Sequence, residues 1–431
     1  MRLRKTITTI VATAILLAGW QLVAVIANQP ELIPSLPRLV RTLCEWLVSG
    51  SFYQSVGATI LRGVLGMSIS FVCAIGMAGL FARFEWVYEL FRPLLAIMRS
   101  IPVISFILLA LIFLNPESIP LMIAFLTMFP LLTENLTRGI LDLRPGLSIM
   151  ARQFHIRRSN VLFQIIYPQL KPFLYSGLAS AAGFGWRAII MGEVLSQCAF
   201  GIGSEMKRAQ NFIAVPELLA WTIVAVFISF FFDKGISKVA DITPKISFAN
   251  EDQTIPTPTL SVLDTKDISY QYGIQHFSHS FQKGIIYGIS APSGKGKTTL
   301  LNLIGGILLP TEGEIHPTRH FGIATIFQQP QLLPHLTAEE NIILPLSSFL
   351  TEEKARRIAQ KHLQEMEMEP FGNRYPKELS YGQQQRIAIA RALAYPSPLL
   401  LMDEPFKGLD EALSPVSYTH LRAHETVLDL V

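Results

Sequence analysis

The residues with the clearest chemical potential form the glycine-rich run APSGKGKTT, residues 291–299. The apolar run GIIYGIS before it indicates a buried strand, and the apolar residues after it recur at helical spacing. In the pattern G-x-x-x-x-G-K-[ST], backbone N–H groups at a helix N-terminus bind phosphate oxygens, the lysine reaches the β and γ phosphates, and the hydroxyl ligates Mg²⁺. The run therefore predicts a site for a nucleoside triphosphate and Mg²⁺.

The run departs from this pattern at one position. Ala291 replaces the first glycine, whereas Gly296, Lys297 and Thr298 match. An alanine there relaxes the turn geometry and leaves the following N–H groups in place. The residues expected to bind phosphate are Ser293, Gly294, Lys295, Gly296, Lys297, Thr298 and Thr299, with Thr298 also a metal ligand.

Three further motifs follow in a specific order. The run IFQQP places Gln328 after a predicted strand, LSYGQQQRIAIARAL opens a helix at Ser380, and LLLMDEP ends a buried strand at Asp403. Together with the phosphate-binding run, this ordered set resembles the ATP-binding cassette of ABC transporters, over residues 261 to about 413. The resemblance implies an α/β P-loop domain that binds and hydrolyses ATP.

The resemblance also implies roles for single residues. Tyr272 would stack on adenine, and Glu404 would be the catalytic residue that polarises the attacking water. Gln328 would join Mg²⁺ and sense a coupling helix, and Asp403 would hold Mg²⁺ through water.

The start of the LSYGQ helix predicts a dimer. Ser380, Gly382 and Gln383 lie at a helix N-terminus, whose partial positive charge favours the γ-phosphate of ATP bound by a second copy of the chain. Tyr381 stands where the family has glycine, which puts the close approach of the backbone in question. The alternative is an ordinary helix cap.

Charge and hydropathy divide the chain in two. The 431 residues are 50% hydrophobic and 16% charged, whereas soluble proteins carry roughly 25% charged residues. Residues 1–240 hold 20 basic and 11 acidic residues, and residues 241–431 hold 16 and 21. The small positive net charge of the whole chain is the sum of a basic first half and an acidic second half. No nucleic-acid partner is therefore expected.

The first half predicts an α-helical membrane domain with six transmembrane helices. No charge occurs over the 25 residues from Thr6 to Pro30 or over the 20 between Arg62 and Arg83, and a bilayer core needs about 20 apolar residues. The other four spans are expected within 100–116, 118–133, 172–204 and 218–232, of which the first two contain or adjoin helix-breaking prolines.

Basic residues set the expected orientation. They concentrate beside the N-terminus and in the loops after the even-numbered spans, and short loops rich in Lys and Arg stay cytoplasmic. The N-terminus and everything after Lys238 are therefore expected in the cytoplasm, in a bacterial inner membrane. A secretory signal peptide is the weaker reading of residues 1–30, because no cleavage site follows.

The cytoplasmic loop between Arg138 and Lys171 has apolar residues at helical spacing and a basic face. It resembles the loop of binding-protein-dependent importer permeases, where a coupling helix fits a cleft on the ATPase. The family's Glu-Ala-Ala-x-x-x-Gly pattern falls on Ile149, Met150, Ala151 and His155, so one of four positions is kept. The alternative is a positive-inside anchor without a coupling role.

Other parts of the membrane half resemble permeases of the nitrate, sulfonate, taurine and thiamine-precursor importers. Arg62, Gly66 and the run WRAIIMGEVLS with Glu193 carry this resemblance. Arg187 and Glu193 are ionisable groups inside a span, where charges are costly. They lie about 240° apart on a helix and are not expected to pair together. Two interpretations of these two charged residues stay open. They either snorkel or form an ion pair with another helix, or they line the transport path.

The sequence thus predicts four regions. Residues 1–240 are a permease domain, 241–260 a Pro- and Thr-rich linker, and 261–413 an incomplete cassette. Residues 414–431 do not resemble the C-terminal part of the cassette family. They resemble a sequencing adaptor that has been translated as if it were coding sequence, and the alternative is a divergent natural C-terminus.

The resemblances imply ATP-driven import of a small solute, delivered by an extracytoplasmic binding protein to a homodimer of fused permease and ATPase. The rival interpretation is a membrane protein whose degenerate cassette binds ATP for regulation, favoured by Ala291 and Tyr381. An exporter is a third possibility. The transported solute stays open.

Overall fold

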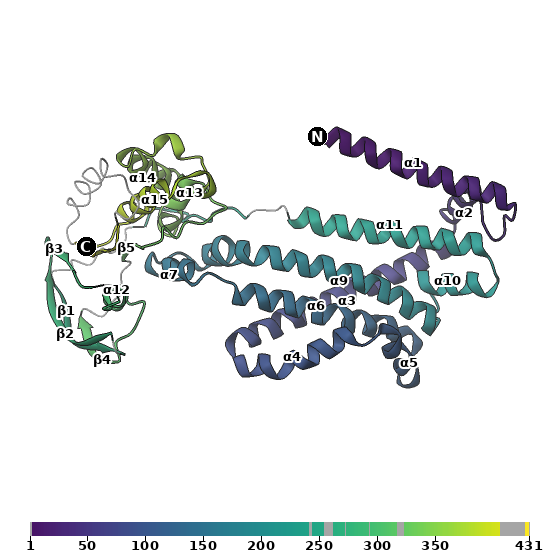
Figure 1. Ribbon diagram of the computed structural model, residues 1–431, viewed down its shortest axis with the longest axis horizontal. Coiled ribbons are helices and arrows are strands. Elements are labelled where there is room, and N and C mark those ends of the chain that lie inside the picture. Colours follow the sequence, from purple (N-terminus) through teal and green to yellow (C-terminus); the bar gives the residue numbers. More distant parts are fainter. Residues whose placement is uncertain are drawn as a thin grey trace. The chain divides into compact units, whose positions relative to one another are not determined.

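The computed structural model describes most of the 431 residues and divides them into two compact units. Unit 1 comprises residues 1–142 and 170–242, and unit 2 comprises residues 143–169 and 243–431 (Figure 1). The described residues are 2–240, 244–253, 262–271, 273–292, 294–316, 323–405 and 427–430, of which 2–6, 9, 10, 239, 240 and 427–430 are described by their backbone alone.

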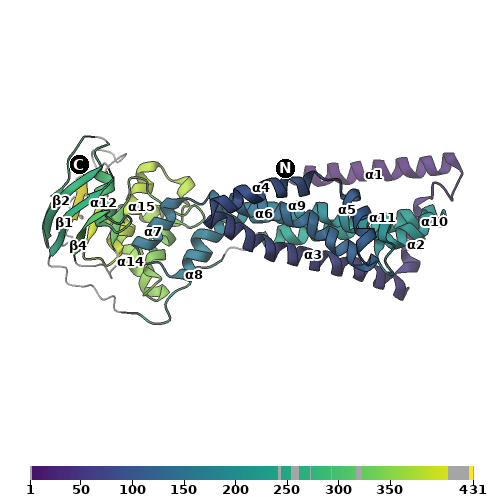
Figure 2. The same cartoon turned by 90° about the horizontal axis from the view of Figure 1, so that it is seen from below.

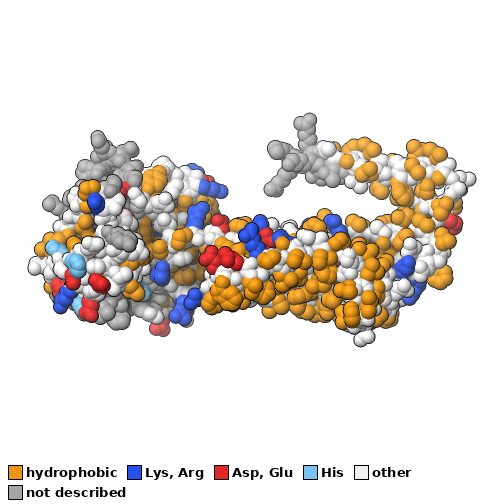
Figure 3. Space-filling model, turned by 60° about the horizontal axis from the view of Figure 1, so that its bottom comes forward, with side chains coloured by type: hydrophobic (Ala, Val, Ile, Leu, Met, Phe, Trp, Pro, Cys, Tyr) orange, Lys and Arg blue, Asp and Glu red, His pale blue; other side chains and the backbone are white. Residues whose placement is uncertain are grey.

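Unit 1 is helical. Its elements are α1 (Arg2–Ala27), α2 (Leu36–Trp46), α3 (Gly50–Arg83), α4 (Glu85–Ser100), α5 (Val103–Phe113), the 3₁₀ turn η1 (Pro116–Ser118), α6 (Ile119–Leu141), α9 (Tyr167–Ser196), α10 (Ile202–Asn211) and α11 (Val215–Ala240). Helices α3, α6, α9 and α11 run along one another in both views (Figures 1 and 2). Hydrophobic side chains cover much of this unit's visible surface, as expected for helices that face lipid (Figure 3).

Four stretches of the described residues are long and apolar enough to cross a membrane. They are Gly50–Arg83, Pro116–Leu141, Arg158–Ser196 and Val215–Lys238. Helices α4 and α5 would make a fifth span if counted together, but they are bent by 94° at their junction. In α1, the apolar part is the shorter Val11–Ala27. The prediction of membrane helices is confirmed, whereas the count of six is not.

Proline explains the difference at the expected third span. The charge-free window from Ser100 to Pro116 becomes the 11-residue helix α5, because Pro102 lies at its start and ends the preceding helix. Proline lacks the N–H group that a continuous helix needs and disfavours helical backbone in the residue before it. A charge-free window therefore overstated the length of the helix.

Small residues bring the helices of unit 1 close together. A Cβ atom on Gly66 of α3 would lie 2.6 Å from Cβ of Ala124 in α6. A Cβ atom on Gly185 of α9 would lie 2.1 Å from Cε of Met128 in α6. Glycine and alanine at such crossings permit the close backbone approach on which packing in a bilayer depends.

Unit 2 combines two sheets with helices. The antiparallel sheet has the order β2-β1-β4, and the parallel sheet has the order β3-β7-β6-β5. The strands are β1 (Val262–Tyr270), β2 (Ile274–Gln282), β3 (Ile286–Gly288), β4 (Glu312–His316), β5 (Ala324–Ile326), β6 (Leu400–Asp403) and β7 (Val427–Leu430). The main helices are α12 (Lys297–Ile304), α13 (Ala338–Leu346), α14 (Glu352–Glu365) and α15 (Tyr381–Ala394). This arrangement confirms the α/β prediction.

Strand β7 comes from the last 18 residues, which the sequence did not assign to the cassette. Its backbone pairs in parallel with β3, at Ile286 opposite Val427, and with β6, at Leu400 opposite Val427. Residues 406–426 lie outside the described part of the chain.

Residues 143–169, here called the inserted segment, belong to unit 2 although α6 and α9 flank them in the chain. The segment contains α7 (Pro145–Gln153), the short helix α8 (Arg158–Asn160) and the π-helical turn η2 (Val161–Ile166). Its apolar side chains share one core with β5, β6, α13, α14 and α15.

Candidate functional site

The phosphate-binding run lies where the sequence predicts, between β3 and α12. Gly294 and Gly296 have positive φ angles of 79° and 85°, and Gly296 begins α12 as its N-cap. A Cβ atom on Gly296 would lie 3.0 Å from the carbonyl oxygen of Gly273. Both glycines are therefore required by backbone conformation. Ala291 has no positive φ angle, so its side chain fits this turn.

The end of β6 contacts the start of α12. The hydroxyl of Thr298 donates a hydrogen bond to Oδ2 of Asp403 at 3.0 Å. The two residues are 105 positions apart in the chain, and the parallel strand that ends at Asp403 places its carboxylate beside the phosphate-binding helix. The fold thus brings together two of the three residues, from different motifs, that the sequence assigned to the metal.

Gln328 and Glu404 meet on the same side of the sheet. Nε2 of Gln328 donates to Oε2 of Glu404 at 2.9 Å. Gln328 follows β5 and Glu404 follows β6, and carboxyl ends of neighbouring parallel strands lie at one edge of a sheet. Glu404 has a φ angle of 46°, which is uncommon for a residue other than glycine and is often found at functional positions.

These side chains suit Mg²⁺. The hydroxyl of Thr298, the carboxylate of Asp403 and the amide oxygen of Gln328 are oxygen ligands, and Mg²⁺ is usually held by one or two carboxylates together with substrate phosphates. The part of the chain that the structure describes has no group of three or more His, Cys, Asp and Glu side chains that could hold a metal ion.

The start of α15 is tied to the same region. Ser380 and Gln383 cap each other, since the Ser380 hydroxyl accepts from the Gln383 N–H at 3.3 Å and the Gln383 side chain accepts from the Ser380 N–H at 2.9 Å. The hydroxyl of Tyr381 donates to the carbonyl oxygen of Gln328 at 2.8 Å. Tyr381 therefore has a structural partner within its own chain.

Two predicted site residues, Tyr272 and Ser293, lie outside the described residues. Gly382 lies in the first turn of α15, beside Tyr381 and Gln383.

The inserted segment begins with α7, which ends in a left-handed turn at His155. The φ angle of His155 is 48°, the N–H of Ile156 donates to the carbonyl of Ala151 at 3.0 Å, and the N–H of His155 donates to the carbonyl of Arg152 at 3.2 Å. These bonds form a Schellman motif, whose left-handed position is usually glycine. His155 thus makes the turn for which the related permeases have glycine.

The inserted segment is buried against the cassette core. Met150 and Phe154 are 1% and 0% exposed. Nε2 of Gln153 donates to the carbonyl of Gly305, at the end of α12, at 2.7 Å, and the N–H of Ile323, just before β5, donates to the carbonyl of Gln153 at 3.1 Å. The loop between Arg138 and Lys171, which resembles the coupling loop of importer permeases, thus packs on the cassette through α7.

A cavity of about 850 Å³ lies between α7 and the glutamine loop, defined here as Gln328–Leu332. Residues 144–147, the glutamine loop, Tyr381 and Gln384 line it. The two sides of the cavity come close to each other at Gly146, where an added Cβ atom would lie 2.5 Å from Oε1 of Gln331. The residue expected to sense a coupling helix thus shares a cavity with α7.

Asn160 joins the inserted segment to residues 244–253, which the sequence assigned to a linker. Its Nδ2 donates to the carbonyl of Ser247 and to Oγ of Ser347, and its Oδ1 accepts from the Ser247 N–H, each at 2.8 Å. Asn160 is 1% exposed, so these bonds satisfy a buried amide. Sequence reasoning missed this residue and Gln153, because a polar residue in a basic loop gives no sign of burial.

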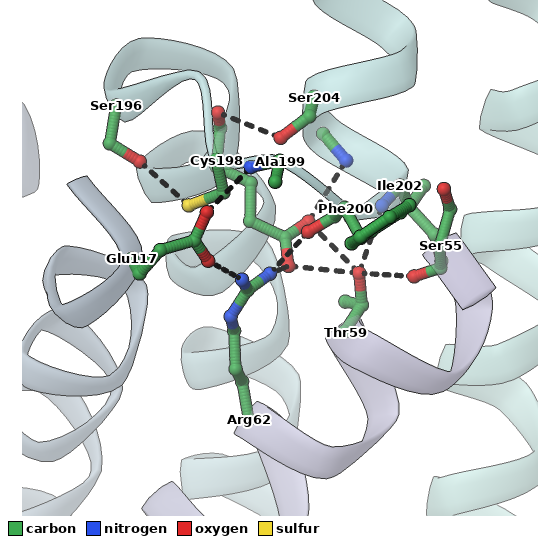
Figure 4. Close-up of polar contacts among 12 residues, drawn as sticks. Ser55, Thr59, Arg62, Glu117, Ser196, Cys198, Ala199, Phe200, Ile202 and Ser204 are labelled. Carbon is green, nitrogen blue, oxygen red and sulfur yellow. Dashed lines mark hydrogen bonds and ion pairs between the residues drawn. The ribbon is translucent and has the colours of Figure 1, made fainter.

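Unit 1 contains a polar cluster around Glu193, which is fully buried near the end of α9 (Figure 4). Its Oε1 pairs with Nη1 of Arg62 at 2.7 Å, and its Oε2 accepts from the Gly203 N–H at 2.9 Å. The Thr59 hydroxyl lies 2.9 Å from both oxygens. Of the two interpretations of Glu193, the ion pair with another helix is thus observed.

The cluster continues through Arg62 to an exposed carboxylate. Nη2 of Arg62 pairs with Oε2 of Glu117 at 2.6 Å, and Oε1 of Glu117 accepts from the Ala199 N–H at 2.6 Å (Figure 4). Arg187 is not part of the cluster, and its guanidinium lies 5.9 Å from the ring centroid of Phe184. As expected, Arg187 and Glu193 do not pair with each other.

Comparison with known proteins assigns two separate parts of the chain to two families. Residues 274–407 match the family model "ABC transporter", and residues 67–233 match "Binding-protein-dependent transport system inner membrane component".

Curated relatives match the cassette. The spermidine/putrescine import ATP-binding protein PotA of Nitrosomonas europaea is 36% identical over 36% of this chain and 46% of its own length, so the chain spans about half of that relative. The thiamine import ATP-binding protein ThiQ of Yersinia pseudotuberculosis is 39% identical over 35% of this chain and 70% of its own length. An uncharacterized ABC transporter ATP-binding protein of Methanocaldococcus jannaschii is 40% identical over 32% of this chain and 68% of its own length.

Two family models in one chain and relatives covered over more than two thirds of their length agree with the nucleotide-site geometry and the apolar helices. The chain therefore belongs to the ABC transporter family, with a permease domain and an ATP-binding cassette fused in one polypeptide.

Proposed function

We propose that this chain uses ATP hydrolysis to import a small solute across the inner membrane. Two copies would form one pathway and two ATP sites, the cassettes would lie in the cytoplasm, and an extracytoplasmic binding protein would deliver the solute. The observation that carries the proposal is the inserted segment, which α6 and α9 flank in the chain and which shares a core with the nucleotide-binding unit.

The site residues have distinct roles in this proposal. Backbone N–H groups of residues 293–299 and the ammonium of Lys297 bind the phosphates. Thr298, Asp403 and Gln328 hold Mg²⁺, which supplies charge stabilisation at the phosphates when bound. Glu404 accepts a hydrogen bond from Gln328 at 2.9 Å and would orient and polarise the attacking water.

The dimer role of α15 rests on its exposed start. Tyr381 is 44% exposed, and the N-terminal N–H groups of α15 follow the Ser380 cap. With Ser380, Gly382 and Gln383 they would bind the γ-phosphate of ATP held by a second copy. Nucleotide would then favour the closed dimer, and hydrolysis would release it, which is a population shift between two states.

The inserted segment supplies the link to the membrane helices. Gln153 bonds both to the end of α12 and to the residue before β5. Rearrangement at the nucleotide would therefore reach a segment covalently continuous with α6 and α9. The regulatory alternative receives no support from the site, because the Thr298–Asp403 and Gln328–Glu404 contacts are both present.

The test measures ATP hydrolysis and ATP binding by the full chain in lipid nanodiscs, with Mg·ATP as the probe. Lys297→Ala should lose both, and Glu404→Gln should lose hydrolysis while retaining ATP binding. Lys361→Ala and Glu353→Gln, both on the exposed face of α14, are the matched controls and should behave as wild type. Wild-type turnover that survives Glu404→Gln would refute the assignment.

A further inference from the structure

Arg391, in α15, is a buried cation that none of the expected roles uses. It is 1% exposed. Its Nη1 donates to the carbonyl of Gln331 and its Nη2 to the carbonyl of Pro330, both at 2.8 Å. Both carbonyls belong to the glutamine loop, so Arg391 holds the backbone of this loop from its buried side.

The burial of Arg391 is poorly explained by stability. Desolvation lowers the pKa of its guanidinium to about 9, so the group is still protonated at neutral pH. Its Nε has no hydrogen-bond partner among the described residues. A buried charge that lacks an opposite charge disfavours folding compared with an apolar residue of similar size. What the charge does provide is two charge-assisted hydrogen bonds to one loop.

The same guanidinium contacts the inserted segment. Its Cζ lies 5.5 Å from the ring centroid of Phe154, within the range of a cation–π interaction. Phe154 is fully buried, and the ring of Tyr395 meets its ring edge-on at 5.2 Å. Arg391 therefore touches the glutamine loop and the inserted segment with one side chain.

The glutamine loop also borders the cavity of about 850 Å³ next to residues 144–147, where Tyr381 bonds to Gln328 and Gln331 comes close to Gly146. Without the two bonds from Arg391, the loop has room to shift toward that cavity. Because Gln328 begins this loop, a shift would lengthen its 2.9 Å bond to Glu404.

We propose that Arg391 is a positioning residue for ATP hydrolysis, which fixes the glutamine loop only while Phe154 of the inserted segment is stacked on it. The inference rests on the proposed function, since it concerns the rate of that reaction. The contacts of Arg391 are with the glutamine loop and Phe154, so it acts on the rate through Gln328 and leaves nucleotide affinity to Lys297 and the residues around it.

The experiment compares Arg391→Met, Phe154→Leu and the double variant in the full chain in nanodiscs. Methionine keeps the apolar stem without the donors, and leucine keeps an apolar side chain without the ring. Arg374→Met, an exposed arginine, and Phe371→Leu, which packs against the same core, are the controls. Steady-state kcat and KM for Mg·ATP and the thermal unfolding midpoint are measured for each.

We expect Arg391→Met to lower kcat at least tenfold, with KM changed less than about twofold and with a folded protein. Phe154→Leu should lower kcat in the same way, and the double variant should be no slower than the slower single variant, because both act on one contact. A purely structural role would lower the unfolding midpoint and leave kcat per folded molecule unchanged.

Unchanged kcat in Arg391→Met, a rise in KM alone, or multiplicative losses in the double variant would each overturn the inference while the wild type still hydrolyses ATP. If Arg391→Met does not fold, Phe154→Leu decides by the same criterion. A wild-type chain that hydrolyses no ATP would overturn the proposed function and this inference together.

Discussion

The buried carboxylate of Glu193 gives the sharpest test of the structure of the permease domain. It has 0% side-chain exposure, whereas Glu117, the other carboxylate on Arg62, is 55% exposed. Replacing Glu193 by glutamine leaves Arg62 without its buried partner and turns an amide N–H₂ group toward donors that it cannot satisfy. Removing one member of a buried ion pair costs about 3–5 kcal/mol, while an exposed pair contributes about 0–1 kcal/mol.

The measurement is the thermal unfolding of the full chain in detergent, followed by tryptophan fluorescence, because Trp186 and Trp221 lie in unit 1. At about 2–4 °C per kcal/mol for a unit of this size, Glu193→Gln should lower the midpoint by about 6–20 °C. The matched variant Glu117→Gln should lower it by less than about 4 °C. The double variant Arg62→Met/Glu193→Gln should lose less than the sum of its single variants, since it leaves no buried unpaired charge and the remaining Glu117 is exposed. Equal falls of the unfolding midpoint in Glu193→Gln and Glu117→Gln would refute the reasoning that the buried carboxylate stabilises unit 1 more than the exposed one.

Two further predictions concern unit 2. His155 has a φ angle of 48°, so His155→Gly should keep or raise the unfolding midpoint. His155→Val should lower the free energy of unfolding by about 1–2 kcal/mol, and with it the midpoint, because a β-branched residue is strained in the left-handed region; an unchanged midpoint for the valine variant would contradict the left-handed turn. The N–H and hydroxyl of Thr351, together with Lys354, lower the pKa of Asp252, so its contribution to stability is present above the unfolded-state pKa and is lost as the pH falls through the lower folded-state pKa. The unfolding midpoint of Asp252→Asn should therefore be lower than that of wild type at pH 7, and the difference between the two midpoints should disappear below about pH 4. A difference that does not depend on pH would contradict the stabilising contacts of the Asp252 carboxylate with Thr351 and Lys354.

The nucleotide site could be predicted from sequence because its motifs are local and ordered. Glycines 294 and 296, Lys297 and Thr298 lie within five residues, and the carboxyl-end rule for parallel strands places Asp403 and Gln328 near them. The Gln328–Glu404 contact required only that β5 and β6 be parallel and adjacent, whereas the Thr298–Asp403 contact joins the helix that follows β3 to the end of β6, and β7 lies between these two strands.

The helix count and the ion pair of unit 1 could not be predicted in the same way. Charge-free windows report hydropathy and not length, so Pro102 turned one expected span into an 11-residue helix. Arg62 and Glu193 are 131 residues apart, and one sequence gives no sign of which helices meet. Arg391 stayed hidden because an arginine in a helix is usually assigned to the exposed face.

Gln153 connects α7 to two separate elements of the cassette. Its side chain donates to the carbonyl of Gly305 at the end of α12, and its carbonyl accepts from the N–H of Ile323, the residue before β5. Gln328 follows β5. Both ends of the nucleotide site are thus connected to one residue of α7. Phe154, the next residue, stacks on Arg391, which holds the glutamine loop. If the proposed function is right, a displacement of α7 would therefore move α12 and the glutamine loop together, and a shift of α7 that affected only one of them would require these contacts to break.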